Sequence, residues 1–210
     1  MGRFEIKEAR RAQLIEATIA SIAKRGFAET TLAHVADGAK LSRGIVNFYF
    51  RSKEELLVET LRYMAQQYES FWKTAVAKAG PAPADKLDAM IEADFHPTAV
   101  SRKHVTVWYA FWGEARWRPE YLRLCTELSD TYFAQTRELC QAIIAAGGYT
   151  DVDADAVARG LNAMIDGLWL DILINPKSVD RAEAKRTCRV FLARFFPSEF
   201  SAITGERTAA

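Results

Sequence analysis

T31-L-A-H-V-A-D-G-A-K-L-S-R-G-I-V-N-F-Y-F-R-S-K-E-E-L56 is the stretch of this 210-residue sequence that decides its fold. It contains two short helical segments separated by a tight turn, and their apolar residues are spaced so that the segments pack together. The packing positions are Leu32, Val35, Ala36, Leu41, Val46 and Phe50. This is the arrangement of a helix-turn-helix, which presents its second helix to the major groove of DNA.

The residues of the second segment that lie off the packing face are free to contact DNA. Arg43 suits guanine as a bidentate donor, Asn47 suits adenine, and Ile45 suits the methyl group of thymine. Flanking side chains and helix N-termini hold phosphates and fix the register without selecting a sequence. The predicted DNA-binding residues are Thr31, Ser42, Arg43, Gly44, Ile45, Asn47, Phe48, Tyr49 and Lys53. A helical hairpin used only for packing is the alternative, although packing does not require these groups at these positions.

The charge of the chain is unevenly distributed. The whole sequence has 28 Lys and Arg against 27 Asp and Glu, so its net charge of +1 does not suggest a nucleic-acid partner. Residues 1–53, however, carry ten basic and five acidic side chains, whereas the remainder carries 18 basic and 22 acidic ones. A basic N-terminal part followed by an acidic remainder places the polyanion-binding surface at the N-terminus.

The composition argues against several other classes of protein. No stretch approaches the roughly 18 to 20 uninterrupted apolar residues of a membrane-spanning helix, and the N-terminus has no apolar signal core. Cys125, Cys140 and Cys188 lie far apart without C-x-x-C spacing, so we expect reduced packing residues rather than a disulfide framework or a zinc site. We therefore expect a cytoplasmic protein.

Helical periodicity runs through most of the chain. The first helix carries Ile15, Ile19 and Ile22 on one face and is expected to end at Gly26. Either Thr30 or Thr31 is suited to cap the second helix.

Serine residues are placed to begin the next two helices. Ser42 is expected to cap a third helix over 43–49, and Ser52 a fourth that extends to 79, with Glu55 completing a capping box. Further helices are expected over 84–95, 101–116, 119–146, 153–174 and 180–196, bounded by Gly and Pro. The predicted fold class is all-α.

Two domains and a tail are expected. Residues 8–68 form an N-terminal three-helix DNA-binding domain with its helix-turn-helix at 31–50. Residues 69–197 form a C-terminal helical domain for ligand binding and dimerisation, and residues 198–210 form a flexible tail.

The stretch quoted first resembles the TetR-type repressors. The match is T-L-x-x-V-A, A-x-L-S-x-G-x-V and Y-F-x-S-K-E-E-L between Thr31 and Leu56. Two departures are visible, because the family usually has Gly where this chain has Lys40 and often has Tyr where it has Asn47. A non-glycine residue at positive φ costs on the order of 1 kcal/mol, so we expect a differently shaped turn at Lys40.

The resemblance extends over nearly the whole chain. Q13-L-I-x-A-T, G44-I with Y-F-R-x-K53, W108-Y-A-F-W112 and I165-D-G-L-W-L170 are similar to the betaine-regulator (BetI) branch of the TetR family. The resemblance implies repression of genes for choline uptake and oxidation to glycine betaine, relieved by choline.

Aromatic residues in the second half of the chain provide a candidate ligand site. Trp108, Phe111 and Trp112 lie at i, i+3 and i+4 on one helical face. Aromatic faces combined with a carboxylate hold quaternary ammonium ions, although the same spacing also suits an ordinary core. The predicted ligand-binding residues are Trp108, Phe111, Trp112, Glu114, Tyr132, Asp166 and Trp169.

The last two helices have apolar residues on more than one side. One face can pack on the body and another on a second copy, as in TetR-type dimers; burial inside a monomer is the alternative. The predicted interface residues are Leu161, Ile165, Leu168, Val190, Phe191 and Phe195. A dimer also suits a helix-turn-helix that binds palindromic DNA.

No feature of the sequence favours an enzyme. His34, His96 and His104 form no ligand cluster, and nucleotide-binding and nucleophile-elbow motifs are absent, so we expect no metal, cofactor or catalytic residue. The expected protein is a homodimeric repressor that binds double-stranded operator DNA and a small inducer similar to choline. Two alternatives remain, namely a TetR-type repressor for an unrelated apolar or aromatic ligand and an architectural DNA-binding protein without a ligand.

Overall fold

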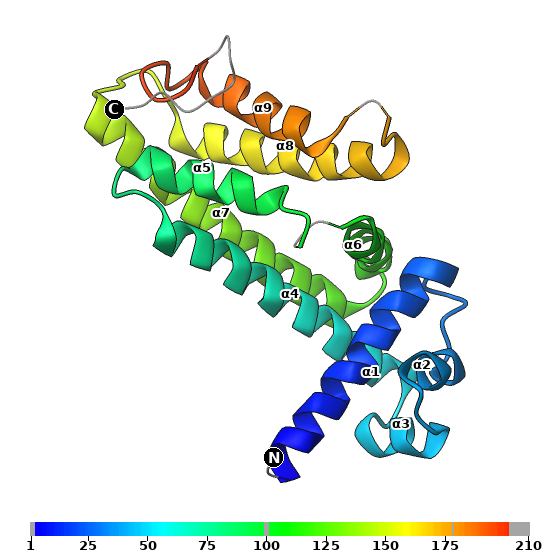
Figure 1. Cartoon of the computed structure of the whole chain (residues 1–210). Coiled ribbons are helices and arrows are strands. Elements are labelled where there is room, and N and C mark those ends of the chain that lie inside the picture. Colours follow the sequence, from blue (N-terminus) through cyan, green and yellow to red (C-terminus); the bar gives the residue numbers. More distant parts are fainter. Residues whose placement is uncertain (1–2, 99–100, 178, 202–210) are drawn as a thin grey trace. The chain divides into compact units, whose positions relative to one another are not determined.

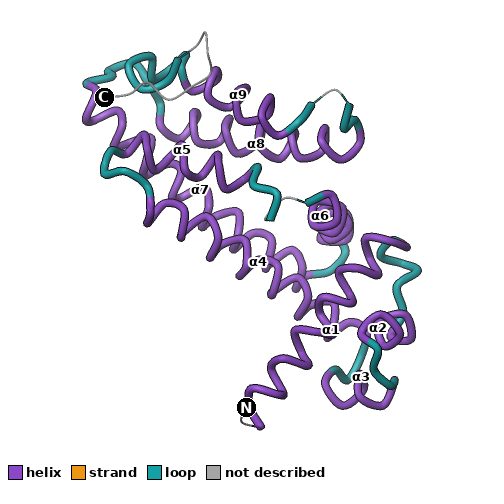
Figure 2. The backbone as a smooth tube through the Cα atoms, viewed as in Figure 1, coloured by secondary structure: helices purple, strands orange, loops and turns teal. Residues whose placement is uncertain are grey.

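The computed structural model describes residues 3–98, 101–177 and 179–201. This part of the chain consists of helices joined by short loops, as the all-α prediction requires (Figure 1, Figure 2). Its helices are α1 (Arg3–Arg25), α2 (Leu32–Ala39), α3 (Arg43–Tyr49), α4 (Lys53–Lys78), α5 (Pro83–Asp94), α6 (Arg102–Ala115), α7 (Pro119–Gly147), α8 (Ala154–Ile174) and α9 (Arg181–Leu192).

Helix α1 organises the N-terminal part of the chain. Its predicted apolar stripe is buried, with Ile19 and Ile22 fully inaccessible to solvent. The helix ends at Gly26, which has a φ of +86° and donates its N–H to the Ile22 carbonyl at 2.8 Å. Because a left-handed residue turns the chain away from the helix axis, α2 can pack across α1. The Gln13 amide then fixes this pairing by donating to the Ala39 carbonyl at 2.7 Å.

The start of α2 resolves the choice between two threonines. Thr31 is the N-cap, since its hydroxyl accepts the His34 N–H at 3.2 Å. Thr30 is buried instead, and its hydroxyl donates to the Gly26 carbonyl at 2.9 Å. One threonine therefore caps the helix and the other stabilises the preceding loop.

The turn between α2 and α3 depends on Lys40. This residue lies in the left-handed region, with φ 54° and ψ 42°, and its N–H donates to the Asp37 carbonyl at 3.1 Å. The Leu41 N–H completes the turn by donating to the Ala36 carbonyl at 3.0 Å. The expectation of a differently shaped turn is therefore wrong, because Lys40 adopts the conformation usual for glycine and retains the strain.

The serine caps of α3 and α4 form as predicted. Ser42 accepts the Ile45 N–H, and Ser52 accepts the Glu55 N–H at 3.1 Å. The return bond of the capping box differs, since the Glu55 carboxylate accepts the N–H of Arg51 at 2.7 Å, one residue before the cap.

The contacts divide the chain into two units, one of residues 1–67 and 103–126 and another of residues 68–102 and 127–210. The division therefore falls within α4 and α7, each of which contributes to both units, and directly after the first residue of α6. The sequence placed 103–126 in the second domain, but these residues group with the N-terminal ones. Packing explains the grouping, because Phe111 of α6 contacts the Phe27 ring with centroids 5.5 Å apart.

In the second unit, α9 packs on both α8 and α5 (Figure 1). Arg189 of α9 forms two hydrogen bonds with the Asp88 carboxylate of α5, at 2.6 and 3.1 Å, and a third with Glu92 at 2.6 Å. The apolar core of this unit includes Trp72, Leu87, Ile91, Leu161, Leu192 and Phe196.

The C-terminal end of α9 is shorter than expected. The helix ends at Leu192 rather than 196, and turns follow it. The expected flexible tail begins at residue 198, yet Phe200 is buried. Residues 202–210 of that tail lie outside the described residues. Across the described ranges, no helix is long and apolar enough to cross a lipid bilayer.

The left-handed backbone at Lys40 is strained because this residue has a Cβ atom. Lys40→Gly should raise the free energy of unfolding by about 0.5 to 1 kcal/mol, because glycine adopts positive φ without a Cβ clash. The greater conformational entropy of glycine in the unfolded chain offsets part of this stabilisation. Thermal or urea unfolding at fixed protein concentration measures it. Lys40→Ala is the control, since it removes the charge but keeps the Cβ. An equal gain in both variants would assign the effect to charge rather than to the backbone.

Candidate DNA-binding surface and effector site

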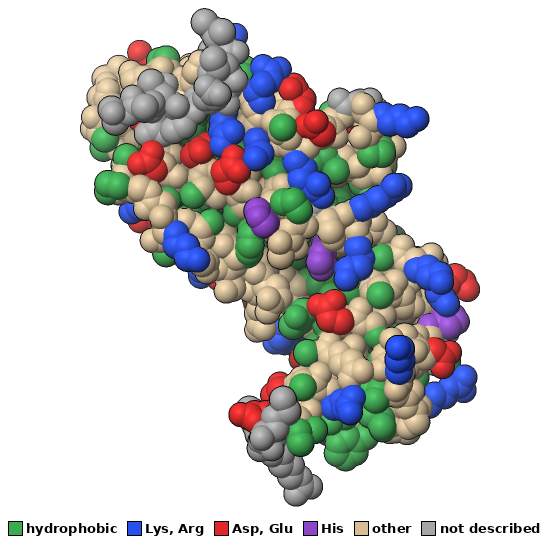
Figure 3. Space-filling view, viewed as in Figure 1, with side chains coloured by type: hydrophobic (Ala, Val, Ile, Leu, Met, Phe, Trp, Pro, Cys, Tyr) green, Lys and Arg blue, Asp and Glu red, His purple; other side chains and the backbone are tan. Residues whose placement is uncertain are grey.

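Helix α3 presents one buried and one exposed side. Val46 is fully buried, and Phe50 directly after the helix is too. The residues predicted to contact bases, Arg43, Gly44, Ile45, Asn47 and Phe48, are all exposed. Figure 3 shows hydrophobic side chains gathered over α3, with Lys and Arg side chains nearby.

The polar side chains on the exposed face of α3 have no partner among the described residues. Neither Arg43 nor Asn47 forms a hydrogen bond or ion pair with another described residue. Phe48 is 78% exposed and Ile45 38% exposed, so this surface of α3 also offers apolar groups. A helix with free amide and guanidinium donors beside apolar groups can contact base edges and thymine methyls.

The remaining predicted contacts surround α3. Thr31 and Ser42 are exposed N-caps of α2 and α3, and Tyr49 is half-buried against the Phe48 ring. Lys53 differs, because its Nζ donates to the carbonyls of Phe27 and Ala28, at 3.4 and 3.2 Å. In the free protein this lysine thus joins the start of α4 to the loop after α1.

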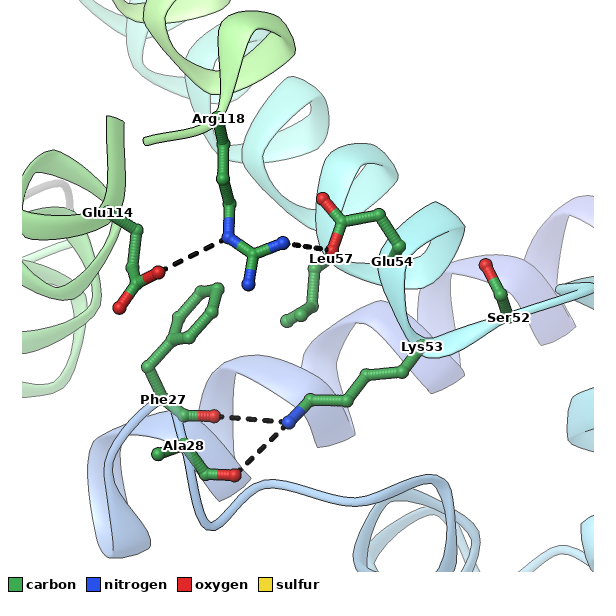
Figure 4. Close-up of a pocket in the computed structure, with 8 residues that line it drawn as sticks. All are labelled: Phe27, Ala28, Ser52, Lys53, Glu54, Leu57, Glu114 and Arg118. Carbon is green, nitrogen blue, oxygen red and sulfur yellow. Dashed lines mark hydrogen bonds and ion pairs between the residues drawn. The ribbon is translucent and has the colours of Figure 1, made fainter. Parts of the chain in front are cut away.

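Lys53 lines a pocket of about 420 Å³ within the first unit (Figure 4). On its other side, Arg118 bridges two helices by donating to Glu54 of α4 at 2.6 Å and to Glu114 of α6 at 3.2 Å. The Arg118 guanidinium also lies over the Phe27 ring, 5.7 Å from its centroid. The pocket therefore contains paired charges that attach α6 to the first turn of α4.

The second unit contains a buried carboxylate surrounded by aromatic rings. Asp94, at the end of α5, is fully inaccessible to solvent. One carboxylate oxygen accepts the Tyr68 hydroxyl at 2.5 Å, and the other accepts the Tyr132 hydroxyl. Trp169 of α8 donates its indole N–H to the Asp94 backbone carbonyl at 2.9 Å.

The rings of this cluster also contact one another. Tyr68 stacks on Tyr132 with centroids 6.0 Å apart, and Trp169 approaches Tyr68 edge-on at 5.6 Å. Trp72 packs edge-on against Tyr132 at 5.6 Å. We call these four rings with Asp94 the aromatic-acid cluster.

Burial governs the electrostatics of the cluster. Loss of hydration raises the pKa of Asp94 to about 7, although the hydrogen bonds from Tyr132 and Tyr68 act in the opposite direction. The nearby Asp166 carboxylate raises the pKa of Asp94 further, and partial desolvation raises the pKa of Asp166 itself to about 6. Asp94 is fully buried among aromatic rings, whereas the Asp166 residue is exposed to solvent nearby, so the buried acid is the one that favours a cation as its neighbour.

Two family models match the chain. Residues 14–60 match the bacterial regulatory proteins of the tetR family, and residues 83–197 match the C-terminal part of the BetI-type transcriptional repressors. This chain belongs to the BetI-type branch of the TetR family. It is therefore a transcriptional repressor rather than an enzyme.

Relatives of this TetR-family repressor are similar over most of their length. The HTH-type transcriptional regulator BetI of Burkholderia thailandensis is 37% identical over 81% of this chain and 85% of its own. The protein of the same name from Paraburkholderia xenovorans is 34% identical over 91% of this chain and 96% of its own.

Solved structures share the fold. A transcriptional regulator from Pseudomonas aeruginosa PAO1 superposes with a TM-score of 0.81 at 26% identity, covering 90% of this chain and 91% of that one. A regulator from Saccharomonospora viridis, solved in complex with choline, gives a TM-score of 0.80 at 23% identity, covering 88% and 95% of the two chains.

The predicted ligand residues of this repressor fall in both units. Tyr132 and Trp169 belong to the aromatic-acid cluster, with Asp166 nearby. The α6 members Trp108, Phe111, Trp112 and Glu114 belong to the first unit. There Phe111 is fully buried, Trp108 lies beside Trp112, and Glu114 pairs with Arg118.

The predicted dimer residues also divide into two groups. Leu161, Ile165 and Leu168 of α8 are buried within one chain. Val190, Phe191 and Phe195, on α9 and the turn after it, are half-buried and partly accessible to a partner.

Sequence inspection missed Asp94, Tyr68 and Trp72. Asp94 carried a detectable signal, because it follows Leu87 and Ile91 at helical spacing and thus puts an acid on the buried face of α5. The sequence signal for Tyr68 and Trp72 was weaker, since it is only their spacing of i and i+4 on α4. No group of His, Cys, Asp and Glu in the described part of the chain could hold a metal ion.

Proposed function

We propose that this repressor binds operator DNA through α3 and releases it when a quaternary ammonium cation, choline or a close relative, occupies the aromatic-acid cluster. The regulated genes would be those for the uptake and oxidation of choline to glycine betaine. The observation that carries the ligand class is the fully buried Asp94 carboxylate among Tyr68, Tyr132 and Trp169.

Sequence selection by α3 follows from its exposed groups. Arg43 is the candidate for guanine, Asn47 for adenine, and Ile45 with Phe48 for thymine methyl groups. Thr31, Ser42, Tyr49 and Lys53, with Gly44 allowing close backbone approach, are proposed to hold phosphates and set the register. Lys53 must exchange its carbonyl partners for a phosphate when DNA binds.

The ligand class follows from the chemistry of the cluster. Quaternary ammonium ions are held by the faces of Trp and Tyr, and each such contact contributes roughly 0.5 to 2 kcal/mol once desolvated. The Asp94 and Asp166 carboxylates would supply the counter-charge. A structure of the same fold from Saccharomonospora viridis contains choline, which supports the same ligand class here.

Release of DNA requires differential affinity. A ligand shifts an equilibrium only if it binds the DNA-incompetent state better than the competent one. Helix α4 begins directly after the recognition region and also carries Tyr68 and Trp72, so it is the proposed connection between ligand and DNA.

Two variants test the DNA contacts. Arg43→Ala should weaken specific binding by about 1 to 3 kcal/mol and relax preference at one base pair. Lys53→Ala should weaken binding to all DNA sequences alike, since it removes one phosphate contact. The slope of the logarithm of the binding constant against the logarithm of the salt concentration should fall in magnitude by about one. Fluorescence anisotropy across salt concentrations measures both quantities. Unchanged operator affinity in both folded variants would refute the assignment.

We further propose a homodimer formed by α8, α9 and the turn after α9, with Val190, Phe191 and Phe195 as its accessible apolar residues. Phe195→Asp should release monomers and abolish tight operator binding. In a symmetric dimer each subunit would bury one unpaired charge at the interface, so the destabilisation applies twice. Sedimentation velocity and operator titration measure the two effects. Leu122→Glu, at an exposed leucine of the first unit, is the control. A wild-type monomer at micromolar concentration would contradict the proposal.

Choline titration tests the ligand. Wild-type protein should bind choline and release operator DNA as choline rises. Trp169→Ala should weaken choline binding roughly 2- to 30-fold, since it removes one cation–π face. Trp117→Ala is the matched control, because Trp117 is 75% exposed in the first unit.

Calorimetry measures choline affinity, and circular dichroism checks that each variant is folded. If wild-type protein shows neither heat nor DNA release at millimolar choline, the ligand proposal is wrong while DNA binding is unaffected.

A further inference from the structure

Asp94 is a buried acid that has hydrogen-bond donors beside it but no ion-pair partner. Both of its carboxylate oxygens accept phenol hydroxyls, from Tyr68 and Tyr132, and it forms no ion pair with any described residue. An ionised carboxylate without a cation partner is costly in an apolar interior. Hydroxyl donors reduce this cost but do not neutralise the charge.

Among the residues that the structure describes, none of the elements packed around Asp94 supplies a cation paired with it. From α4 the group faces Tyr68, from α7 Tyr132, and from α8 Trp169 and the Asp166 carboxylate. From α9, Cys188 lies close enough for Asp94 to affect it. Arg189, which follows Cys188 on α9, is already paired with the carboxylates of Asp88 and Glu92. The named neighbours of Asp94 are therefore aromatic rings, a thiol and another acid, and none of them is a cation.

We propose that Asp94 selects the charge of the effector: its protonated form must give up the proton before a ligand with a fixed positive charge can bind beside it. This inference rests on the proposed ligand class. In this exchange of a proton for a cation, the Asp94 O–H bond breaks, the proton passes to solvent, and the carboxylate becomes the counter-ion of the ligand. The charge of Asp94 falls by one as the charge of the ligand enters, so the sum of these two charges stays at zero.

The burial and pKa of Asp94 support the exchange. With a pKa of about 7, the acid is mostly protonated at pH 6 and mostly ionised at pH 8. A cation binds the ionised form, so its affinity should rise with pH through about 7 and level off above it. A neutral ligand of the same shape has no such preference, and it should bind with little dependence on pH.

The wild-type experiment uses two probes of matched shape. Choline and its uncharged isostere 3,3-dimethyl-1-butanol differ in a single atom, nitrogen or carbon. Choline affinity should rise about tenfold from pH 6 to pH 8, with release of about one proton at pH 6, whereas the isostere should show neither effect. Calorimetry in buffers of different ionisation enthalpy measures affinity and proton release together. This experiment requires no variant to fold.

Two variants of the cluster test which residue is responsible. Asp94→Asn should remove most of the proton release, with Asp166 as the remaining source, and reduce the preference for choline over the isostere at pH 8 from at least about tenfold to within about threefold. Tyr68→Phe should shift the midpoint of the pH dependence upward, because the Tyr68 hydrogen bond lowers the pKa of Asp94. A merely structural role of Tyr68 would weaken binding at every pH without moving the midpoint. Asp130→Asn, at an exposed aspartate of the same unit, is the matched control.

The outcomes separate this inference from the proposed function. Choline binding that is independent of pH and releases no proton would overturn the role of Asp94 and leave choline as the ligand. No choline binding by wild-type protein at pH 8 would overturn both. Loss of most of the proton release in Asp94→Asn but not in Asp130→Asn would support the inference.

Discussion

The burial of Val46 and Phe50 is the constraint on which the DNA-binding end of the molecule depends. Helix α3 has seven residues, and isolated helices shorter than about 12 to 15 residues are marginal in water. It therefore exists because its inner side is packed and Ser42 caps its start. That packing uses one side only, so the other side can carry polar groups chosen for DNA.

A different constraint acts in the second unit, where an acid replaces an apolar side chain. Asp94 lies where α5 otherwise carries Leu87 and Ile91, and hydrogen bonds from Tyr68 and Tyr132 hold it there. A ligand relieves repression only if it binds the DNA-incompetent state better than the competent one. In the proposed function, the aromatic-acid cluster would be the site where that difference in affinity arises.

In the first unit, an aromatic contact and two ion pairs connect α6 with the loop after α1 and with the start of α4. Phe111 packs on Phe27, and Arg118 pairs with both Glu54 and Glu114. These contacts explain why residues 103–126 group with the N-terminus although they follow α5 in sequence. A division by sequence order could not find this, since it depends on which side chains meet across about 60 to 90 positions of the chain.

The sequence by itself determined the helices, their caps and the outer face of α3, because periodicity and capping are local properties. It also determined the family, since T31-L to E-L56 and I165-D-G-L-W-L170 are contiguous motifs. Tertiary structure alone decided that Lys40 keeps the left-handed turn and that Tyr68, Asp94 and Tyr132 meet. The reason is physical: these three residues lie on α4, α5 and α7, and only the packing of those helices brings a buried acid together with the hydroxyls that satisfy it.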